Sequence, residues 1–320
     1  MYCWLMRGLI EKYSQTNFQP HHHPMNTLKT ILVVVDFSTG SRSALEQAAR
    51  LAGLNGAKLH VLHVVDTASI QSLADSRGER FERQAITTTE GASAALTRWL
   101  AQSGVPADCE TTIAVGVPLH EILEHEQKEK PDLLVAGITG AHGALSGAGS
   151  VSTKLARNAK SKLLLVRADH ASVFRKIVAC IDFSDTAREV ATQAHRVALQ
   201  DGAVVNFLHV WLDPWLAMPF MMPVVAADTQ LPETFMPNLH SSLKEFVSEA
   251  AQDIESAEIL YESSNYANGI AAHATESQAD LIVIGAKGHT NLRYVLLGST
   301  AERLLTRLPC SMLIVKSEVE

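Results

Sequence analysis

The segment "KTILVVVDFSTGSRSALEQAARLA", residues 29–52, decides the fold, because the chain repeats it as "RKIVACIDFSDTAREVATQAHRVA" at residues 175–198. Each copy places an apolar run before an Asp-Phe-Ser tripeptide and apolar residues at helical spacing after it. Ile31–Val35 is continuously apolar, which is typical of a parallel strand covered on both faces. The residues that follow predict a helix capped by Ser38 or Ser41.

Three further pairs of segments extend the repeat along the chain. "LHVLHVV" (59–65) matches "VNFLHVW" (205–211), "PDLLVAGITGAHG" (131–143) matches "ADLIVIGAKGHTN" (279–291), and "SKLLLVRAD" (161–169) matches "CSMLIVKSE" (310–318). Asp36 and Asp182 are 146 positions apart, and Gly137 and Gly285 are 148 apart. A period this long indicates a duplicated domain rather than a solenoid of short repeats.

The repeat divides the chain into an extension and two domains. We expect a first domain over 28–169, a second over 174–320, and a short connector between them. Residues 1–27 are interpreted as a disordered or non-native extension, with Met25 as a candidate native start. The histidines at 21–23 are assigned to this tail rather than to a metal site, because no further ligands follow nearby.

Within the first domain, strand-like and helix-like segments alternate. The expected strands after the first are Leu59–Val65, Glu110–Val115, Leu133–Ala136 and Leu163–Arg167, with helices around 80–102 and 118–129 and from Ser150. The stretch Ser69–Arg83 reads as a polar approach to the helix around 80–102. This alternation predicts an α/β fold of two tandem doubly wound domains, each a five-stranded parallel sheet with helices on both faces.

Composition excludes several classes of protein. With 47% apolar and 19% charged residues, the 320-residue chain can bury two cores. The net charge of −7 argues against nucleic acid as a partner, and no apolar run reaches the roughly 20 residues of a membrane helix. Cys3, Cys109, Cys180 and Cys310 form no CxxC pair, so we expect reduced, structural cysteines in a cytoplasmic protein.

A glycine-rich loop stands out in the second copy. Gly285 and Gly288 follow the expected strand Leu281–Ile284, and Gly298 with Ser299 opens the next helix. Glycine lets a backbone approach a ligand closely, and a helix start attracts anions. The loop also contains the cationic residues Lys287, His289 and Arg293. A tight strand-to-helix connection is the plain alternative, but duplication and positive charge favour a phosphate-binding loop.

These residues carry a resemblance to a known family. From about Leu28 to Glu318 the chain resembles the universal stress protein family in its tandem, two-domain form. Gly285, Gly288, Gly298 and Ser299 fit the motif of that family's ATP-binding members, and "VDFS", "IDFS" and "LHV" also match. The resemblance implies an adenine-nucleotide alpha-hydrolase-like fold. It also implies that the last strands of the two domains pair as a pseudo-dimer, and a homodimer of chains is compatible with it.

The resemblance assigns roles to particular residues of the second domain. Asp182 would contact the nucleoside part of ATP, AMP or ADP, and Val210 would line the adenine slot. Lys287, Ser299 and Thr300, with the loop glycines, would hold the phosphates, which Mg²⁺ could bridge. Asp182 alternatively reads as a helix N-cap or turn residue. The strand histidines His63 and His209 are interpreted as structural.

The first copy departs from this pattern. Its corresponding residues are Asp36, Val64, Gly137, Gly140, Gly149 and Ser150. Gly149 comes one position early, and the segment 138–153 contains no Lys or Arg. We therefore expect the second domain to bind nucleotide better than the first, because each missing charge-assisted hydrogen bond weakens binding by roughly 1–3 kcal/mol.

No constellation for hydrolysis is recognised beside the loop, and Glu302 is expected to face solvent on its helix. The resemblance implies an ATP- or AMP-binding regulatory protein in the stress response, and the residues favour slow or no turnover, with no catalytic or metal-binding residue assigned. A nucleotide-independent interaction scaffold and a slow ATPase are the alternatives. The Pro- and Met-rich segment 213–237 fits a flap, an interface patch or packing on its own domain.

Overall fold

The computed structural model describes residues 28–103, 105, 109–139, 147–168, 170–212, 233–288 and 297–316. The interpretations of residues 1–27, Gly140, His289 and Arg293, and of most of the segment 213–237, lie outside the described residues.

The first domain is a five-stranded parallel sheet with connecting helices. Along the chain it comprises β1 (Thr30–Val35), α2 (Thr39–Asn55), β2 (Lys58–Asp66), α3 (Thr67–Arg77), α4 (Phe81–Gln102), β3 (Glu110–Gly116), α5 (Pro118–Glu129), β4 (Leu133–Gly137), α6 (Ser150–Asn158) and β5 (Lys162–Val166). The strands lie in the order β3-β2-β1-β4-β5, so the order reverses beside β1. This is the predicted doubly wound arrangement.

The second domain repeats the same topology. It comprises β6 (Lys176–Cys180), α7 (Asp185–Asp201), β7 (Val204–Trp211), α9 (Phe235–Val247), β8 (Ser256–Glu262), α10 (Tyr266–Glu276), β9 (Leu281–Gly285), α11 (Ser299–Leu305) and β10 (Ser311–Val315). Its strand order is β8-β7-β6-β9-β10, which mirrors the first domain. The two predicted α/β domains are confirmed.

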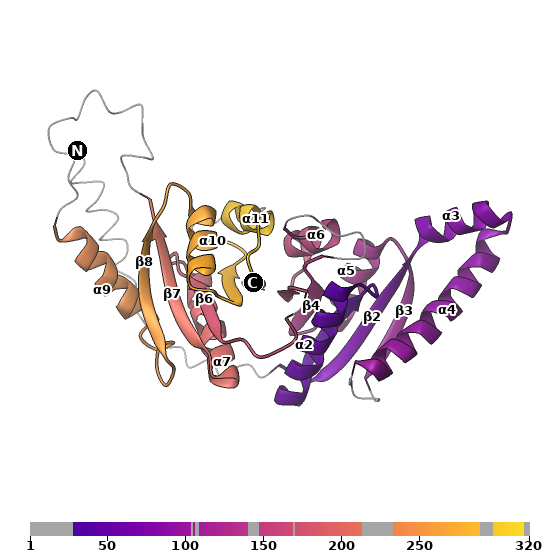
Figure 1. Cartoon of the computed structure of the whole chain (residues 1–320), viewed down its shortest axis with the longest axis horizontal. Helices are drawn as coiled ribbons and strands as arrows, with labels where there is room; N and C mark the ends of the chain where they lie inside the picture. The colour runs from indigo at the N-terminus through magenta and orange to yellow at the C-terminus, as the bar shows by residue number, and fades with distance from the viewer. Residues whose placement is uncertain are drawn as a thin grey trace, which may run out of the picture.

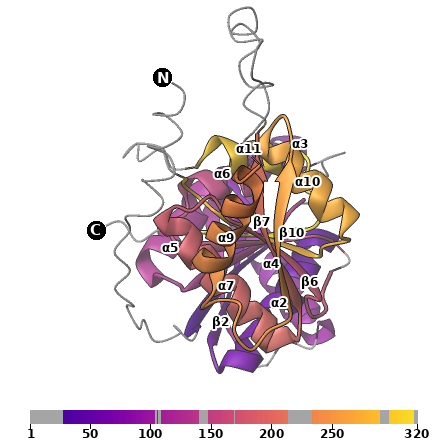
Figure 2. The ribbon, with the colours of Figure 1, turned by 90° about the vertical axis from the view of Figure 1, so that its left-hand side faces the viewer.

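The last strands of the two domains join them into one ten-stranded sheet. β5 and β10 pair antiparallel, with Leu164 opposite Leu313. The side-by-side domains are visible in Figure 1, and Figure 2 looks along the molecule from the end where α9 lies. Because the join is antiparallel, the carboxyl edges of the two parallel sheets face opposite ways. The expected pseudo-dimer of domains is therefore confirmed.

Two hydrophobic layers cover the sheet across both domains. Successive strand residues point to opposite faces, so Ile31 belongs to one layer and its neighbour Leu32 to the other. The first layer contains residues of α2, α4, α7 and α9, and the second contains residues of α5, α6, α10 and α11. Burial of both faces explains why the strands read as continuous apolar runs.

Local sequence signals account for most element boundaries. Ser38 is the N-cap of α2, and its side chain accepts a hydrogen bond from the backbone N–H of Ser41. The stretch Ser69–Arg83, expected as an approach to a helix, instead contains most of a separate helix, α3. Asp66 caps its start and Gly78 ends it in the left-handed conformation.

Cys180 and Cys310 are free thiols. Burial raises the pKa of Cys310 to about 12 and the pKa of Cys180 still further. Such thiols are unreactive, which supports the structural role predicted for both residues.

Candidate functional site

Asp182 lies at the carboxyl edge of the second domain, two residues after the end of β6. Its Oδ1 accepts hydrogen bonds from the backbone N–H of Ser184 at 3.1 Å and from the Ser184 hydroxyl at 2.5 Å. The helix N-cap of α7 is Ser184, so Asp182 itself is a turn residue and not the cap. One oxygen of the Asp182 carboxylate thus fixes the turn.

The other oxygen of Asp182 faces the glycine loop. A Cβ atom placed on Gly288 would lie 2.7 Å from Asp182 Oδ2. The acidic residue after the first strand of the domain and the loop after its fourth strand therefore meet, although 106 residues separate Asp182 from Gly288. The structure brings together these two predicted parts of the site.

Packing of the described residues requires glycine at position 285 of the loop but not at position 298. A Cβ on Gly285 would lie 2.8 Å from Thr186 Cγ2 in the first turn of α7, so packing of the strand end on the helix excludes a side chain there. Among the described residues, a Cβ on Gly298 would meet only the carbonyl of Ala286 at 3.4 Å, and the φ of Gly298 is −69°. Local packing explains Gly285, whereas it leaves Gly298 open to another explanation.

The remaining predicted residues of the second domain occupy different environments. Lys287 is half-buried beside Gly288, while Ser299 is exposed and Thr300 half-buried in the first turn of α11. Val210 is buried, and a Cβ on Gly269 of α10 would lie 2.7 Å from Val210 Cγ1. Val210 therefore packs beneath α10, and its role beside an adenine base stays a prediction.

A second lysine adjoins this edge, and the sequence reasoning missed it. Lys316 follows β10, and its Nζ donates to the carbonyl of Ala156 in α6 of the first domain at 2.5 Å. Burial lowers the pKa of Lys316 to about 8, Glu126 opposes this shift, and the positive charge of Lys287 adds to it. The signal was available, because Lys316 follows the strand that pairs with β9.

The two strand histidines are structural, as predicted. His209 Nδ1 lies 2.8 Å from the carbonyl of Ile181, and His63 Nδ1 lies 2.8 Å from the carbonyl of Val35. Each imidazole therefore donates from Nδ1 to the end of the neighbouring strand.

Glu302 is exposed to solvent, as predicted, and it also forms an ion pair with the exposed Arg157 of α6, across the two domains. Its carboxylate contributes to the contact between α11 and α6.

The first domain forms the same edge with different loop contacts. Asp36 Oδ1 accepts from the backbone N–H of Ser38, and Gly149 is the N-cap of α6. Val64 is half-buried, and Ser150 is exposed at the start of α6. The described residues of the possible nucleotide site in the first domain therefore lie at the carboxyl edge of its sheet, as their positions after the strands predict.

The loop of the first domain is tied to the second domain. The backbone N–H of Ala148 donates to the carbonyl of Leu305 at the end of α11. Gly147 has a φ of +79°, and a Cβ there would lie 2.5 Å from the carbonyl oxygen of Thr306. In addition, the hydroxyl of Ser152 donates to the carbonyl of Gly137 at the end of β4. Residues 147–148 and the first turn of α6 are thus held by contacts within the protein.

Comparison with known families agrees with the duplication of the domain. A model described as the universal stress protein family matches residues 27–167 and again residues 174–316. The chain belongs to the universal stress protein family. Universal stress protein YxiE of Bacillus subtilis is 26% identical over 152 residues, which cover 45% of this chain and 100% of that protein. A universal stress protein of Methanocaldococcus jannaschii is 32% identical over 146 residues, covering 45% of this chain and 84% of its own length.

Solved universal stress protein structures share the two-domain fold. One from Archaeoglobus fulgidus has a TM-score of 0.64 at 19% identity, over 90% of this chain and 98% of its own. A putative universal stress protein from Pseudomonas aeruginosa has a TM-score of 0.63 at 20% identity, over 92% and 95% of the two chains. The chain therefore shares the two-domain fold of these universal stress protein structures. Across the described parts of the chain, no helix has the length and apolar character to span a bilayer.

Proposed function

We propose that the second domain of this universal stress protein binds an adenine nucleotide, ATP or AMP, in a regulatory role with slow or no hydrolysis. The observation that carries the proposal is the contact between Asp182 and Gly288, because it joins an acceptor for hydroxyl or amino groups to a loop suited to phosphate. Open parallel sheets bind ligands at this carboxyl edge, beside the reversal of strand order.

The proposed roles follow from the chemistry of each residue. Asp182 would accept hydrogen bonds from the ribose or the adenine amino group, and Val210 would contact the base. The phosphates would lie against Gly298, Ser299 and Thr300, near the charge of Lys287. Gly298 supports this placement, because no side chain or backbone group among the described residues lies close enough to require glycine there.

We propose weaker binding by the first domain. Its loop is bonded to α11 through Ala148, and the carbonyl of Gly137 is bonded to Ser152. Residue 301, which corresponds to Ser152 in the second domain, is alanine. A nucleotide at the first domain would have to displace contacts of this kind without a lysine or arginine in the loop to compensate.

The duplicated aspartates provide a matched test. We expect mass spectrometry to detect an adenine nucleotide released from the denatured protein, and calorimetry to show one dominant ATP site with or without Mg²⁺. Asp182→Asn should weaken ATP binding about ten-fold or more, as expected for a lost charged acceptor, while Asp36→Asn should leave the dominant site unchanged. The proposal fails if no nucleotide binds, or if only Asp36→Asn weakens binding.

The same purified proteins distinguish a nucleotide-binding regulator from the two alternative functions. A nucleotide-independent scaffold would release no nucleotide. A slow ATPase would release phosphate at a rate that Gly298→Val abolishes, whereas we propose little or no release. A cytoplasmic location and association of chains into a homodimer belong to the proposal, and sedimentation with and without ATP would test the second.

A further inference from the structure

An aromatic residue in an unfavourable backbone conformation follows each site aspartate. Phe183 has a φ of 62° and Phe37 a φ of 63°. The left-handed region is disfavoured for bulky side chains, and it persists only where the surroundings enforce it. The same exception occurs at the same place in both domains, next to Asp182 and Asp36.

A stack of side chains from three further elements holds the Phe183 ring. The ring centroid of Phe183 lies 4.8 Å from that of His209 in β7 and 5.4 Å from that of Phe246 in α9. The guanidinium carbon of Arg188 in α7 lies 4.5 Å from the centroid of Phe246. Aromatic and cation–π contacts at such distances are attractive, so the stack opposes the backbone cost at Phe183.

The first domain contains the same stack with one change of residue. Phe37 lies 4.5 Å from His63 and 5.6 Å from Trp99, and Arg42 lies 5.3 Å from the Trp99 ring. Trp99 on α4 replaces Phe246 on α9. The stack is therefore a duplicated unit and not an accident of one turn.

The stack holds the chain on both sides of Asp182. His209 contacts the Phe183 ring after the aspartate, and its Nδ1 donates to the carbonyl of Ile181 before it. We propose that Phe183, clamped by His209 and Phe246, is a positioning residue that aims the Asp182 carboxylate at the nucleoside part of the ligand. The inference rests on the proposed nucleotide site and adds to it a residue that touches no ligand.

A double-mutant cycle tests whether Phe183 acts through Asp182. Phe183→Gly tolerates the positive φ but removes the ring that enforces it. We expect it to weaken binding of both ATP and AMP about ten-fold, which equals about 1.4 kcal/mol, whereas Phe183→Tyr keeps the ring and the affinity. In the Asp182→Asn background, Phe183→Gly should cause no further loss, because the group it positions is already gone.

Phe37→Gly is the matched control for folding, since it removes the equivalent ring from the first domain. It should lower the melting temperature by a similar amount and leave the dominant affinity unchanged. Additive losses in the cycle, or equal affinities of wild type and Phe183→Gly, would overturn the positioning role while leaving the site intact. Absence of ATP and AMP binding by the wild type would instead overturn the proposed function and this inference together.

Discussion

At the residue scale, groups from both domains surround Lys316 and affect its pKa. Its ammonium group contacts the carbonyl of Ala156 near the C-terminal end of α6, where the helix dipole is negative. Burial nevertheless lowers its pKa from 10.5 to about 8, and Lys287 contributes in the same direction. The charged form is therefore less favourable in the folded protein than in the unfolded chain, which binds its proton up to a higher pH.

This difference predicts how Lys316 affects stability as the pH changes. Between about pH 8 and 10.5 the unfolded chain binds more protons at this position, so stability should rise with pH. The difference in free energy of unfolding between the wild type and Lys316→Met should shift in favour of the wild type as the pH rises from about 8 to 10.5. Below about pH 8 this difference should stay constant. Urea denaturation at pH 7.5 and pH 10 would measure the gain, with the exposed Lys128→Met as a control. Parallel pH profiles for wild type and Lys316→Met would contradict the prediction.

At the scale of elements, the end of β9 approaches the first turn of α7 at Gly285. We expect Gly285→Ala to destabilise the protein by about 1–3 kcal/mol, because the new methyl group would overlap Thr186 Cγ2. Thr186→Ser removes only that methyl group, so the double variant should recover much of the loss. Gly298→Ala is the matched control. Its methyl group would overlap no atom of the described residues, and the substitution should reduce ATP affinity more than stability. Chemical denaturation and calorimetry would measure the two effects, and an additive double variant would rule out the overlap.

The elements that the sequence predicts are those with strong local signals. Apolar runs before Asp36 and Asp182 identify β1 and β6, since strands buried on both faces need apolar residues throughout. The helix α3 was missed because it buries little, with only Ile70 and Ala74 buried. The proximity of Asp182 to Gly288 could also be predicted, because the carboxyl ends of neighbouring parallel strands lie at the same edge of the sheet. The bond from Lys316 to Ala156 could not be predicted from local pattern, because it depends on how two domains join.

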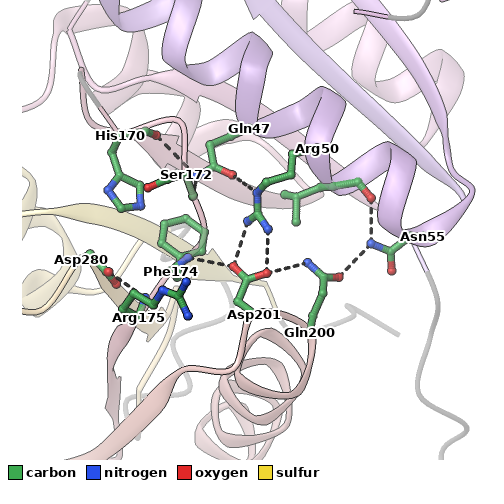
Figure 3. A network of polar contacts seen from close by, with 11 residues as sticks. Gln47, Arg50, Asn55, His170, Ser172, Phe174, Arg175, Gln200, Asp201 and Asp280 are labelled. Carbon is green, nitrogen blue, oxygen red and sulfur yellow. Dashed lines mark hydrogen bonds and ion pairs between the residues drawn. The ribbon is translucent and has the colours of Figure 1, made fainter. Parts of the chain in front are cut away.

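At the scale of the whole molecule, a pseudo-two-fold axis relates the domains, and one polar network breaks its symmetry. Arg50 donates two hydrogen bonds to the fully buried carboxylate of Asp201, at 2.7 and 2.9 Å (Figure 3). The same carboxylate accepts from the backbone N–H of Phe174 in the connector. Arg196 and Asn55 lie 146 positions from Arg50 and Asp201, and they make the mirror-related contact through one hydrogen bond at 2.9 Å.

The asymmetry predicts that mirror-related substitutions have unequal effects. Asp201→Ala would leave the Arg50 guanidinium and the Phe174 N–H without their shared acceptor, and loss of one partner of a buried ion pair costs about 3–5 kcal/mol. Asn55→Ala would remove a neutral hydrogen bond to Gln200, worth about 0.5–1.5 kcal/mol, and the hydrogen bond from the charged Arg196, worth about 1.5–3 kcal/mol.

Urea denaturation of the full chain would give both values, and Asp201→Asn would separate the charge from the hydrogen bonds. Equal costs at positions 55 and 201 would mean that the Asp201 ion pair adds no more to the domain interface than the hydrogen bonds of Asn55. A larger cost at Asp201 would show that the duplicated halves have diverged at their interface. A carboxylate present in only the second domain would then hold Phe174, which precedes β6, and the two helices α2 and α7 at once.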